Sequence, residues 1–354
     1  MNSTLMILAM IISGQVIAET PKADAQNQKK KEQSAADGWP SGISETRYLS
    51  SADGTEQPAL MYNPQKKEAV PLLVALHTWK GDYRQRQPQY AQWCIKNGWG
   101  MIHPDFRGGN DKPEACGSEL VVKDIVSAVN FAKTVFKVDE NRIYLVGASG
   151  GGHAALLMAG RNPEIWAAVS AWCPIYDLKE WHAESKKRGG HYSDMIEKAC
   201  GGAPGDSPAV DREYSLRSPS SHIRNAAGIP VDINTGIADG HSGSVPVTHS
   251  LNAYNALADR ADRIPDEIVT AIAANQVMPE KLKQNIDDPL YESSPALFRK
   301  ISGKTRVTVF QGGHQINYSA ALNWLNWQRK GQAPLWSGNI SSADPAIGTE
   351  EANK

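Results

Sequence analysis

Several common sequence signals are absent from this chain of 354 residues. Its 37 basic and 38 acidic residues leave a net charge of -1, so no basic excess indicates nucleic acid or an anionic membrane. No Gly-Lys-Ser/Thr follows a glycine-rich loop, and no G-x-G-x-x-G is followed by a suitably spaced acidic residue. We therefore expect no nucleic-acid partner and no nucleotide cofactor.

Cysteine is also scarce. The four cysteines are Cys94, Cys116, Cys173 and Cys200, and none forms a C-x-x-C pair. A structural zinc site is therefore not expected. In an exported protein these residues could pair in three ways, and pairing of sequence neighbours would close short loops. Disulfides are favoured here, with four buried thiols as the alternative.

The N-terminal segment predicts export. Its apolar run, Leu5 to Ile12, is too short to span a bilayer stably. Val16 and Ala18 then suit a signal-peptidase site, so residues 1–18 are interpreted as a cleaved signal peptide. Met1 to Thr4 lacks Lys and Arg, and the alternative is a buried N-terminal helix. No cysteine follows the run, so we expect a secreted or periplasmic protein without a membrane anchor.

The rest of the chain is interpreted as one domain between two polar segments. Residues 19–37 have almost nothing to bury and predict a disordered linker. Residues 38–336 form the domain, and 337–354 a polar tail. Residues 174–220, rich in Gly, Pro and charge, predict a lid-like excursion, which we call the lid.

Apolar runs alternate with helical patterns along the domain, which predicts an α/β fold: a mostly parallel central sheet with helices on both faces. Strands are expected at 46–50, 58–62, 69–77, 100–103, 143–146, 167–172, 230–236 and 306–310. Helices are expected at 87–97, 119–136 and 318–329, and 247–300 is expected to be mostly helical.

The motif Gly147-Ala148-Ser149-Gly150-Gly151 joins a strand pattern to a helix pattern. A serine on such a sharp turn is exposed above the sheet edge, beside the positive end of the following helix. Acyl transfer requires a nucleophile in this position. G-x-S-x-G also occurs by chance, and similar turns bind phosphate, so the assignment depends on an acid and a histidine elsewhere.

Both partners follow in the required order. Asp239 comes after the expected strand at 230–236, and His314 after the strand at 306–310. Loops after parallel strands meet at one sheet edge. Ser149 would be the nucleophile, His314 the base and Asp239 the residue that orients His314. Asp232 is a rival acid, but it lies inside its strand.

Two backbone amides should stabilise the oxyanion. Gly150 follows the nucleophile and supplies one amide. The other should come from the loop that opens at His77, where Trp79 is preferred and Thr78 is the alternative.

The remaining histidines are expected to be structural. His77 and His103 end strands, and His153 lies one helical turn after the nucleophile. A metal site of His241 and His249 with Asp239 lacks a strong ligand spacing. We therefore expect no metal and no cofactor.

Taken together, these pieces resemble an α/β-hydrolase of the prolyl-oligopeptidase and dienelactone-hydrolase group, from about Tyr48 to Arg329. The resemblance is carried by Leu76-His77-Thr78-Trp79, Asp105-Phe106-Arg107-Gly108, the Ser149 motif, Asp239 to Pro246 and Gly313-His314. It implies the fold and the triad but not the substrate. Thr78 stands where many relatives have glycine, which would reshape the oxyanion loop.

The sequence favours an esterase over a peptidase. Too few residues precede the first core strand to form the propeller of oligopeptidases. Trp172 and Trp181 fall near the catalytic edge, where indoles could stack on sugar rings or pack under the lid. A secreted serine esterase acting on a small ester, or on acetyl or feruloyl esters of a polysaccharide, is therefore predicted. The alternatives are a small serine peptidase and a non-catalytic carbohydrate-binding relative.

Overall fold

The computed structural model describes residues 38–291 and 293–336. The signal peptide (1–18), the linker (19–37) and the polar tail (337–354) lie outside the described residues and stay predictions. Within the described ranges, no helix has the length and apolar character needed to cross a membrane.

A single sheet runs through the described part of the chain, with nine strands in the order β1-β2-β4-β3-β5-β6-β7-β9-β8. The strands are β1 Ile43–Leu49, β2 Glu56–Tyr62, β3 Val70–Leu76, β4 Gly100–Pro104, β5 Val138–Ala148, β6 Ala168–Trp172, β7 Val231–Gly236, β8 Ala296–Ser302 and β9 Thr305–Phe310. The six strands from β4 to β9 in this order pair in parallel, and both edges are antiparallel. The predicted mostly parallel sheet is confirmed.

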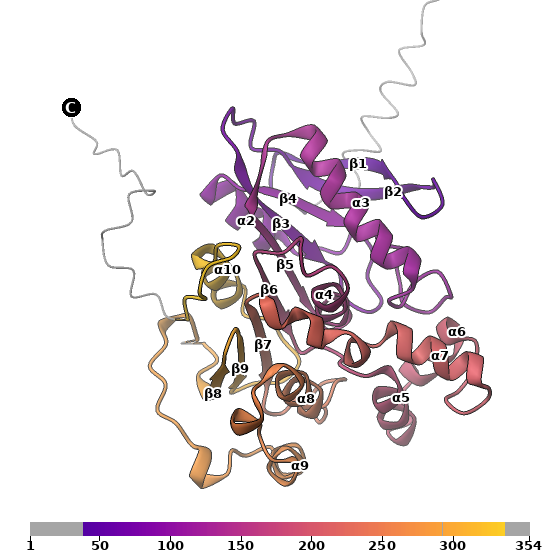
Figure 1. The fold of residues 1–354 in the computed structure, drawn as a ribbon, viewed down its shortest axis with the longest axis vertical. Coiled ribbons are helices and arrows are strands. Elements are labelled where there is room, and N and C mark those ends of the chain that lie inside the picture. The colour runs from indigo at the N-terminus through magenta and orange to yellow at the C-terminus, as the bar shows by residue number, and fades with distance from the viewer. Residues whose placement is uncertain (1–37, 292, 337–354) are drawn as a thin grey trace, which may run out of the picture.

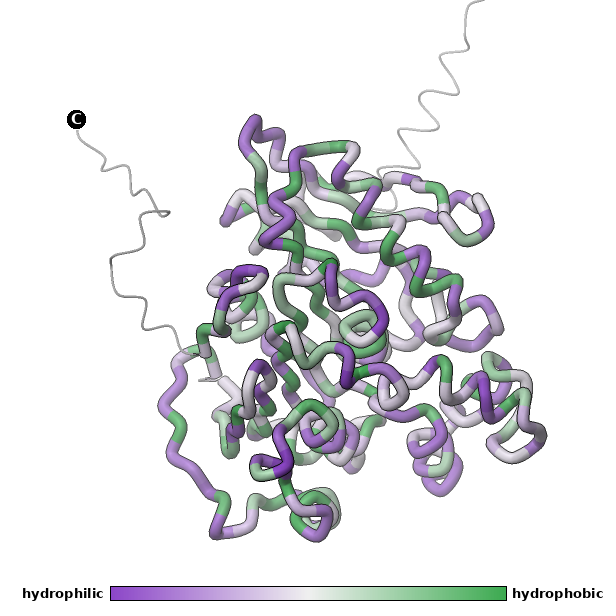
Figure 2. The backbone as a smooth tube through the Cα atoms, in the orientation of Figure 1, coloured by the Kyte–Doolittle hydropathy of each residue, from purple (hydrophilic) through white to green (hydrophobic). Residues whose placement is uncertain are grey.

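Helices cover both faces of this sheet (Figure 1). They are α2 Pro88–Asn97, α3 Glu119–Val135, α4 Gly150–Arg161, α5 Leu178–Lys187, α6 Tyr192–Cys200, α7 Pro208–Arg217, α8 Val247–Leu257, α9 Asp266–Asn275 and α10 Tyr318–Trp327. Strand β3 shows how one sheet serves two cores. Leu72 and Val74 pack with residues of α3, α4, α8 and α9, whereas Leu73 packs on the opposite face with residues of α2 and α10. Figure 2 shows the resulting pattern, with apolar colour on the central strands and hydrophilic colour on many outer turns.

The lid folds as helices α5, α6 and α7, which lie together beside the main body in Figure 1. Asp177 and Ser207 cap α5 and α7 by accepting hydrogen bonds from amides of the first helical turn. An apolar cluster that includes Leu178, Trp181 and Ile196 joins the lid helices. Trp79, Cys116 and Val245 of the main body belong to the same cluster, so the lid helices are packed onto the body.

Two expectations were wrong. Residues 296–300, placed in a mostly helical stretch, belong to the edge strand β8 (Ala296–Ser302), where Ala296 and Phe298 are buried against β9. A short apolar run of this kind fits either structure. The other wrong expectation is the disulfides: all four cysteines are buried free thiols. Cys94 lies in α2 and packs in the core, whereas Cys116 and Cys200 pack in the lid cluster.

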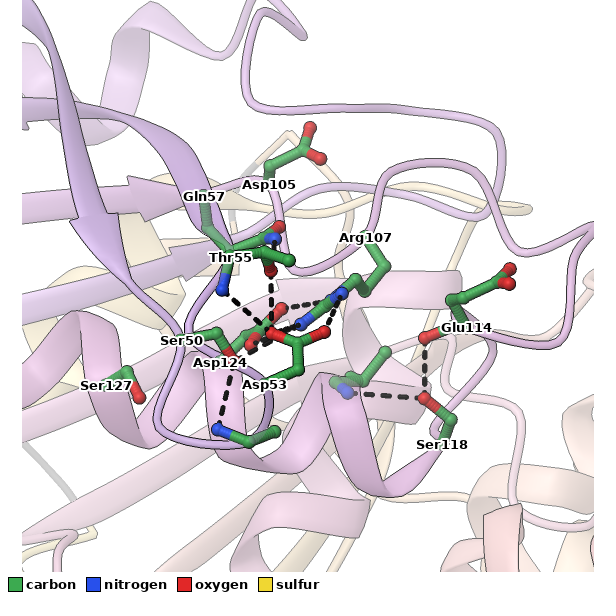
Figure 3. A network of polar contacts seen from close by, with 12 residues as sticks. Ser50, Asp53, Thr55, Gln57, Asp105, Arg107, Glu114, Ser118, Asp124 and Ser127 are labelled. Atoms are coloured by element: carbon green, nitrogen blue, oxygen red, sulfur yellow. Dashed lines mark hydrogen bonds and ion pairs between the residues drawn. The ribbon is translucent and has the colours of Figure 1, made fainter.

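Arg107 ties the first hairpin to the body of the protein (Figure 3). Its guanidinium contacts Asp53 at 2.9 Å, in the turn between β1 and β2, and the buried Asp124 of α3 at 2.5 Å. Asp105, two residues earlier, accepts a hydrogen bond from the Tyr83 amide at 3.2 Å. The Arg107 side chain also holds the pKa of Asp53 below its usual range.

Replacing Arg107 with alanine should destabilise the fold. The Asp124 side chain has no exposed surface, and the variant leaves its charge without this partner. We expect a loss of about 3 kcal/mol in the free energy of unfolding, measured by urea denaturation. Arg161→Ala is the matched control, because its ion pair with the exposed Glu119 should contribute no more than about 1 kcal/mol. Equal losses in the two variants would contradict this account.

Candidate active site

Ser149 lies at the junction of β5 and α4, and its backbone is strained. Its φ of 58° is in the left-handed region, which a serine rarely adopts. Glycines on either side permit the turn. A Cβ at Gly147 would lie 2.3 Å from the Gly151 carbonyl oxygen, and one at Gly151 would lie 2.5 Å from that of Leu76. Side chains at these two positions would push β5, α4 and the end of β3 apart.

Asp239 and His314 lie in direct contact. Nδ1 of His314 lies 2.8 Å from Oδ2 of Asp239. The other oxygen, Oδ1, accepts hydrogen bonds from the amides of Gly240 at 2.9 Å and Val245 at 3.3 Å. Asp239 is 1% exposed. A buried, hydrogen-bonded carboxylate in this position fixes the orientation of the imidazole and leaves Nε2 as the available base.

Ser149 is not hydrogen-bonded to this pair. Nε2 of His314 is buried and has no hydrogen-bond partner among the described residues. Ser149 is half-buried, and its amide donates to the Trp172 carbonyl at 2.9 Å. Nucleophile and base are often loosely aligned before substrate binds. The structure thus joins two of the three predicted residues directly.

Asp232 is held elsewhere. It lies near the start of β7, where its carboxylate pairs with the guanidinium of Arg306, on β9, at 2.7 Å. Both side chains are almost fully buried. Asp239 follows the opposite, carboxyl end of β7. The residue paired with His314 is therefore Asp239, as the sequence predicts, and Asp232 has a structural partner.

The backbone of Trp79 lies directly against Gly150. A Cβ at Gly150 would lie 2.4 Å from the Trp79 nitrogen. The Thr78 amide donates to the side-chain carbonyl of Gln85 at 2.7 Å, so it is already used. The Trp79 amide has no hydrogen-bond acceptor among the described residues. This geometry favours Trp79 over Thr78 as the second oxyanion donor.

The two tryptophans expected to stack on sugar rings are inaccessible. Trp172 and Trp181 are both 0% exposed. Trp172 stacks on Tyr291 inside the sheet core. Trp181 donates its indole N–H to the Ser244 carbonyl at 2.8 Å and packs edge-on against Trp79. The sugar-binding assignment is thus corrected: lid packing covers Trp181, which instead supports the oxyanion loop.

The histidines at strand ends and on α4 have structural partners. Nε2 of His77 lies 2.7 Å from the Asp105 carbonyl oxygen, and Nδ1 of His103 lies 2.7 Å from that of Ala75. Nε2 of His153 lies 2.9 Å from the Arg217 carbonyl oxygen. Burial lowers the pKa of His103 to about 3 and that of His153 to about 4, so both are neutral near pH 7.

His241 and His249 do not converge with Asp239. Nε2 of His241 lies 2.7 Å from the Ala273 carbonyl oxygen, and Nε2 of His249 lies 3.0 Å from the Glu184 carboxylate. The metal site weighed from these residues is therefore not assembled.

Cys173 is a residue at the site that the sequence reasoning missed. It follows β6 directly, and its thiol lies 3.5 Å from the Gln315 carbonyl oxygen and 3.8 Å from that of Gly313. These two carbonyls flank His314. A usable signal was present, because Cys173 directly follows β6, the strand adjacent to β5, which Ser149 follows.

Comparison with known proteins supports this reading of the fold. The profile of the prolyl oligopeptidase family matches residues 86–271, just over half of the chain, including Ser149 and Asp239. The chain belongs to this family. It is therefore a serine hydrolase with an α/β-hydrolase fold.

Individual relatives match over part of their length. The quorum-quenching protein AidA of Acinetobacter baumannii is 31% identical over 124 residues, which cover 34% of this chain and 40% of the relative. The acylaminoacyl peptidase of Pyrococcus horikoshii aligns with a TM-score of 0.55 at 15% identity, over 83% of this chain and 43% of the peptidase. A puromycin hydrolase gives 0.53 at 15% identity, over 83% of this chain and 40% of the hydrolase. The chain spans less than half of each relative, and the two structures share its fold.

Asp239→Asn should lower kcat without lowering stability, and Asp232→Asn should lower stability without lowering kcat. Losing the Asp239 carboxylate should lower kcat by about 10⁴-fold with normal folding, since the imidazole loses its orienting charge. Losing the Asp232 carboxylate leaves Arg306 buried without its ion pair. It should cost about 3–5 kcal/mol of stability while folded molecules keep their kcat. Steady-state kinetics and urea denaturation separate these effects, and the reverse pattern would overturn the assignment of the acid.

Gly150→Ala should displace the Trp79 amide, because the new methyl group would collide with the backbone of that loop. We expect kcat to fall by about 10² to 10³-fold, as for the loss of one oxyanion donor. Gly228→Ala is the matched control, since a Cβ there meets nothing within 4 Å. Unchanged kcat in Gly150→Ala would remove Trp79 from the oxyanion site.

Proposed function

We propose that this serine hydrolase cleaves carboxylic esters through an acyl-enzyme. The observation that carries the proposal is the contact between Asp239 and His314 at the carboxyl edge of the sheet, the edge on which the strained turn presents Ser149. The Gly150 and Trp79 amides lie next to that turn. Acyl transfer requires a nucleophile, a base, an acid that orients the base, and oxyanion donors. In this proposal, the five residues supply all of these groups.

The reaction proceeds in two halves. Oγ of Ser149 attacks the ester carbonyl carbon while Nε2 of His314 takes the hydroxyl proton, and the two amides donate to the oxyanion. The tetrahedral intermediate collapses as His314 returns that proton to the alcohol, which leaves. Water then attacks the acyl-enzyme with His314 again as base, and the acid and free Ser149 are regenerated.

An ester fits this site better than a peptide with a free amino end. Three of the four glutamates of the lid already have partners: Glu184 contacts His249 at 3.0 Å, Glu197 contacts His182 at 2.7 Å and Glu213 contacts Arg217 at 2.8 Å. An alcohol also leaves with less need for protonation than an amine. The buried indoles remove the main support for a polysaccharide, so we propose a small ester as the substrate.

Peptide-bond hydrolysis is the second candidate. It is favoured by the family match, because that family is named for prolyl oligopeptidase. The active-site chemistry is the same, and the two candidates differ in the leaving group.

A substrate panel distinguishes them. We expect the chain to release p-nitrophenol from p-nitrophenyl acetate, and Ser149→Ala to lower kcat by about 10⁶-fold with an unchanged melting temperature. His314→Ala should lower kcat similarly. A lactone, acetylated xylan and peptide p-nitroanilides are run alongside. Serine-dependent turnover of peptides but not esters would favour the peptidase, and no serine-dependent turnover of any substrate would overturn the proposed chemistry.

A further inference from the structure

Cys173, Asp239 and His314 form a cluster of three potential metal ligands. One ligand atom from each, a thiol sulfur, a carboxylate oxygen and an imidazole nitrogen, lies within 4.8 Å of the other two. Across residues 38–291 and 293–336, no other group of three or more His, Cys, Asp and Glu side chains converges in this way. The cluster shares Asp239 and His314 with the five-residue acyl-transfer machinery and adds the Cys173 thiol, which that machinery does not use.

The cluster is enclosed on one side and open on the other. Cys173 and Asp239 are each 1% exposed, whereas the side chain of His314 is 21% exposed. A small cation could therefore enter past the imidazole. Ligand atoms around tetrahedral zinc lie about 3 to 4 Å apart, so side-chain shifts of about 1 Å bring all three onto one ion.

The donor set selects the kind of cation. Thiolate and imidazole are preferred by Zn²⁺ and Cd²⁺, while Mg²⁺ demands oxygen ligands in an octahedral arrangement. The carbonyl oxygens of Gly313 and Gln315 beside the sulfur hold the thiol close to the His314 loop. The sulfur is therefore placed to act together with the imidazole.

We propose that Cys173, Asp239 and His314 form an inhibitory site for a thiophilic divalent cation such as Zn²⁺. The cation binds Sγ, a carboxylate oxygen and Nδ1, and water completes the tetrahedron. The thiol proton leaves to solvent as the S–Zn bond forms, and the Nδ1 proton moves to Nε2. His314 then carries its proton on the nitrogen that must accept one from Ser149. The enzyme loses its general base, a consequence that rests on the proposed function.

Inhibition kinetics test the role of the sulfur. Zn²⁺ should inhibit p-nitrophenyl acetate turnover reversibly, with activity restored by EDTA, and Mg²⁺ should not inhibit. The inhibition of each variant is measured relative to that variant's own uninhibited rate. Cys173→Ser should raise the Zn²⁺ inhibition constant about 100-fold above that of the wild type. Cys94→Ala is the matched control, because that buried thiol lies in α2 and should leave the inhibition constant unchanged. Equal inhibition of wild type and Cys173→Ser would overturn the proposal.

A metal-binding measurement, which needs no turnover, tests the metal site independently of the proposed esterase activity. Cd²⁺ titration should produce an ultraviolet sulfur-to-metal charge-transfer band, with one equivalent lost in Cys173→Ser and retained in the inactive Ser149→Ala. Retention of the full band in Cys173→Ser would overturn the metal site. Normal Cd²⁺ binding in a chain that hydrolyses no ester would overturn the proposed function and leave the metal site standing.

Discussion

Three stretches of backbone touch one another directly at Ser149, and the active site depends on that contact. Strand β5, the first turn of α4 and the loop after β3 approach so closely that Gly147, Gly150 and Gly151 have no room for a side chain. The serine at this contact has a strained backbone, and the Trp79 nitrogen lies close to Gly150. Nucleophile and oxyanion donors are therefore products of one packing constraint, which only glycine satisfies.

A second layer of packing supports the oxyanion loop from the lid. Trp181 of α5 packs edge-on against Trp79 and donates its indole N–H to the loop that follows Asp239. Arg188, directly after α5, donates to the carbonyls of Gly240 and Ser244 in the same loop. The lid thus touches both the oxyanion side and the acid side of the site. Its large indoles hold the catalytic loops in place, so their contribution to substrate binding is indirect.

Local signals in the sequence were sufficient for eight of the nine strands and for the order of Ser149, Asp239 and His314. The residue at which a parallel strand ends shows which edge of the sheet that residue reaches. In the G-x-S-x-G turn, glycines are needed because the neighbouring backbone leaves no room for side chains. Features that depend on distant packing could not be predicted. Arg107 reaches Asp53 across 54 residues, and the burial of Trp181 depends on helices that the sequence showed only as a polar excursion.

Other differences have equally specific causes. The alternating pattern of β8 is short and interrupted, so the helical pattern that precedes it was extended over these residues in the prediction. Spacing along the chain gave no information about which cysteines share a packing cluster. The sequence did not distinguish Cys173 from the other cysteines, because its position at the site depends on how the loops after β7 and β9 pack around it.

The buried Asp232–Arg306 pair stabilises the strand register on which the alignment of acid and base depends. It cross-links the starts of β7 and β9, the two adjacent strands whose far ends carry Asp239 and His314. A slip of one residue between these strands would separate the ion pair and misalign the catalytic loops at once. The strand register that aligns Asp239 with His314 is therefore fixed at the edge of the sheet opposite to the one at which the two residues react.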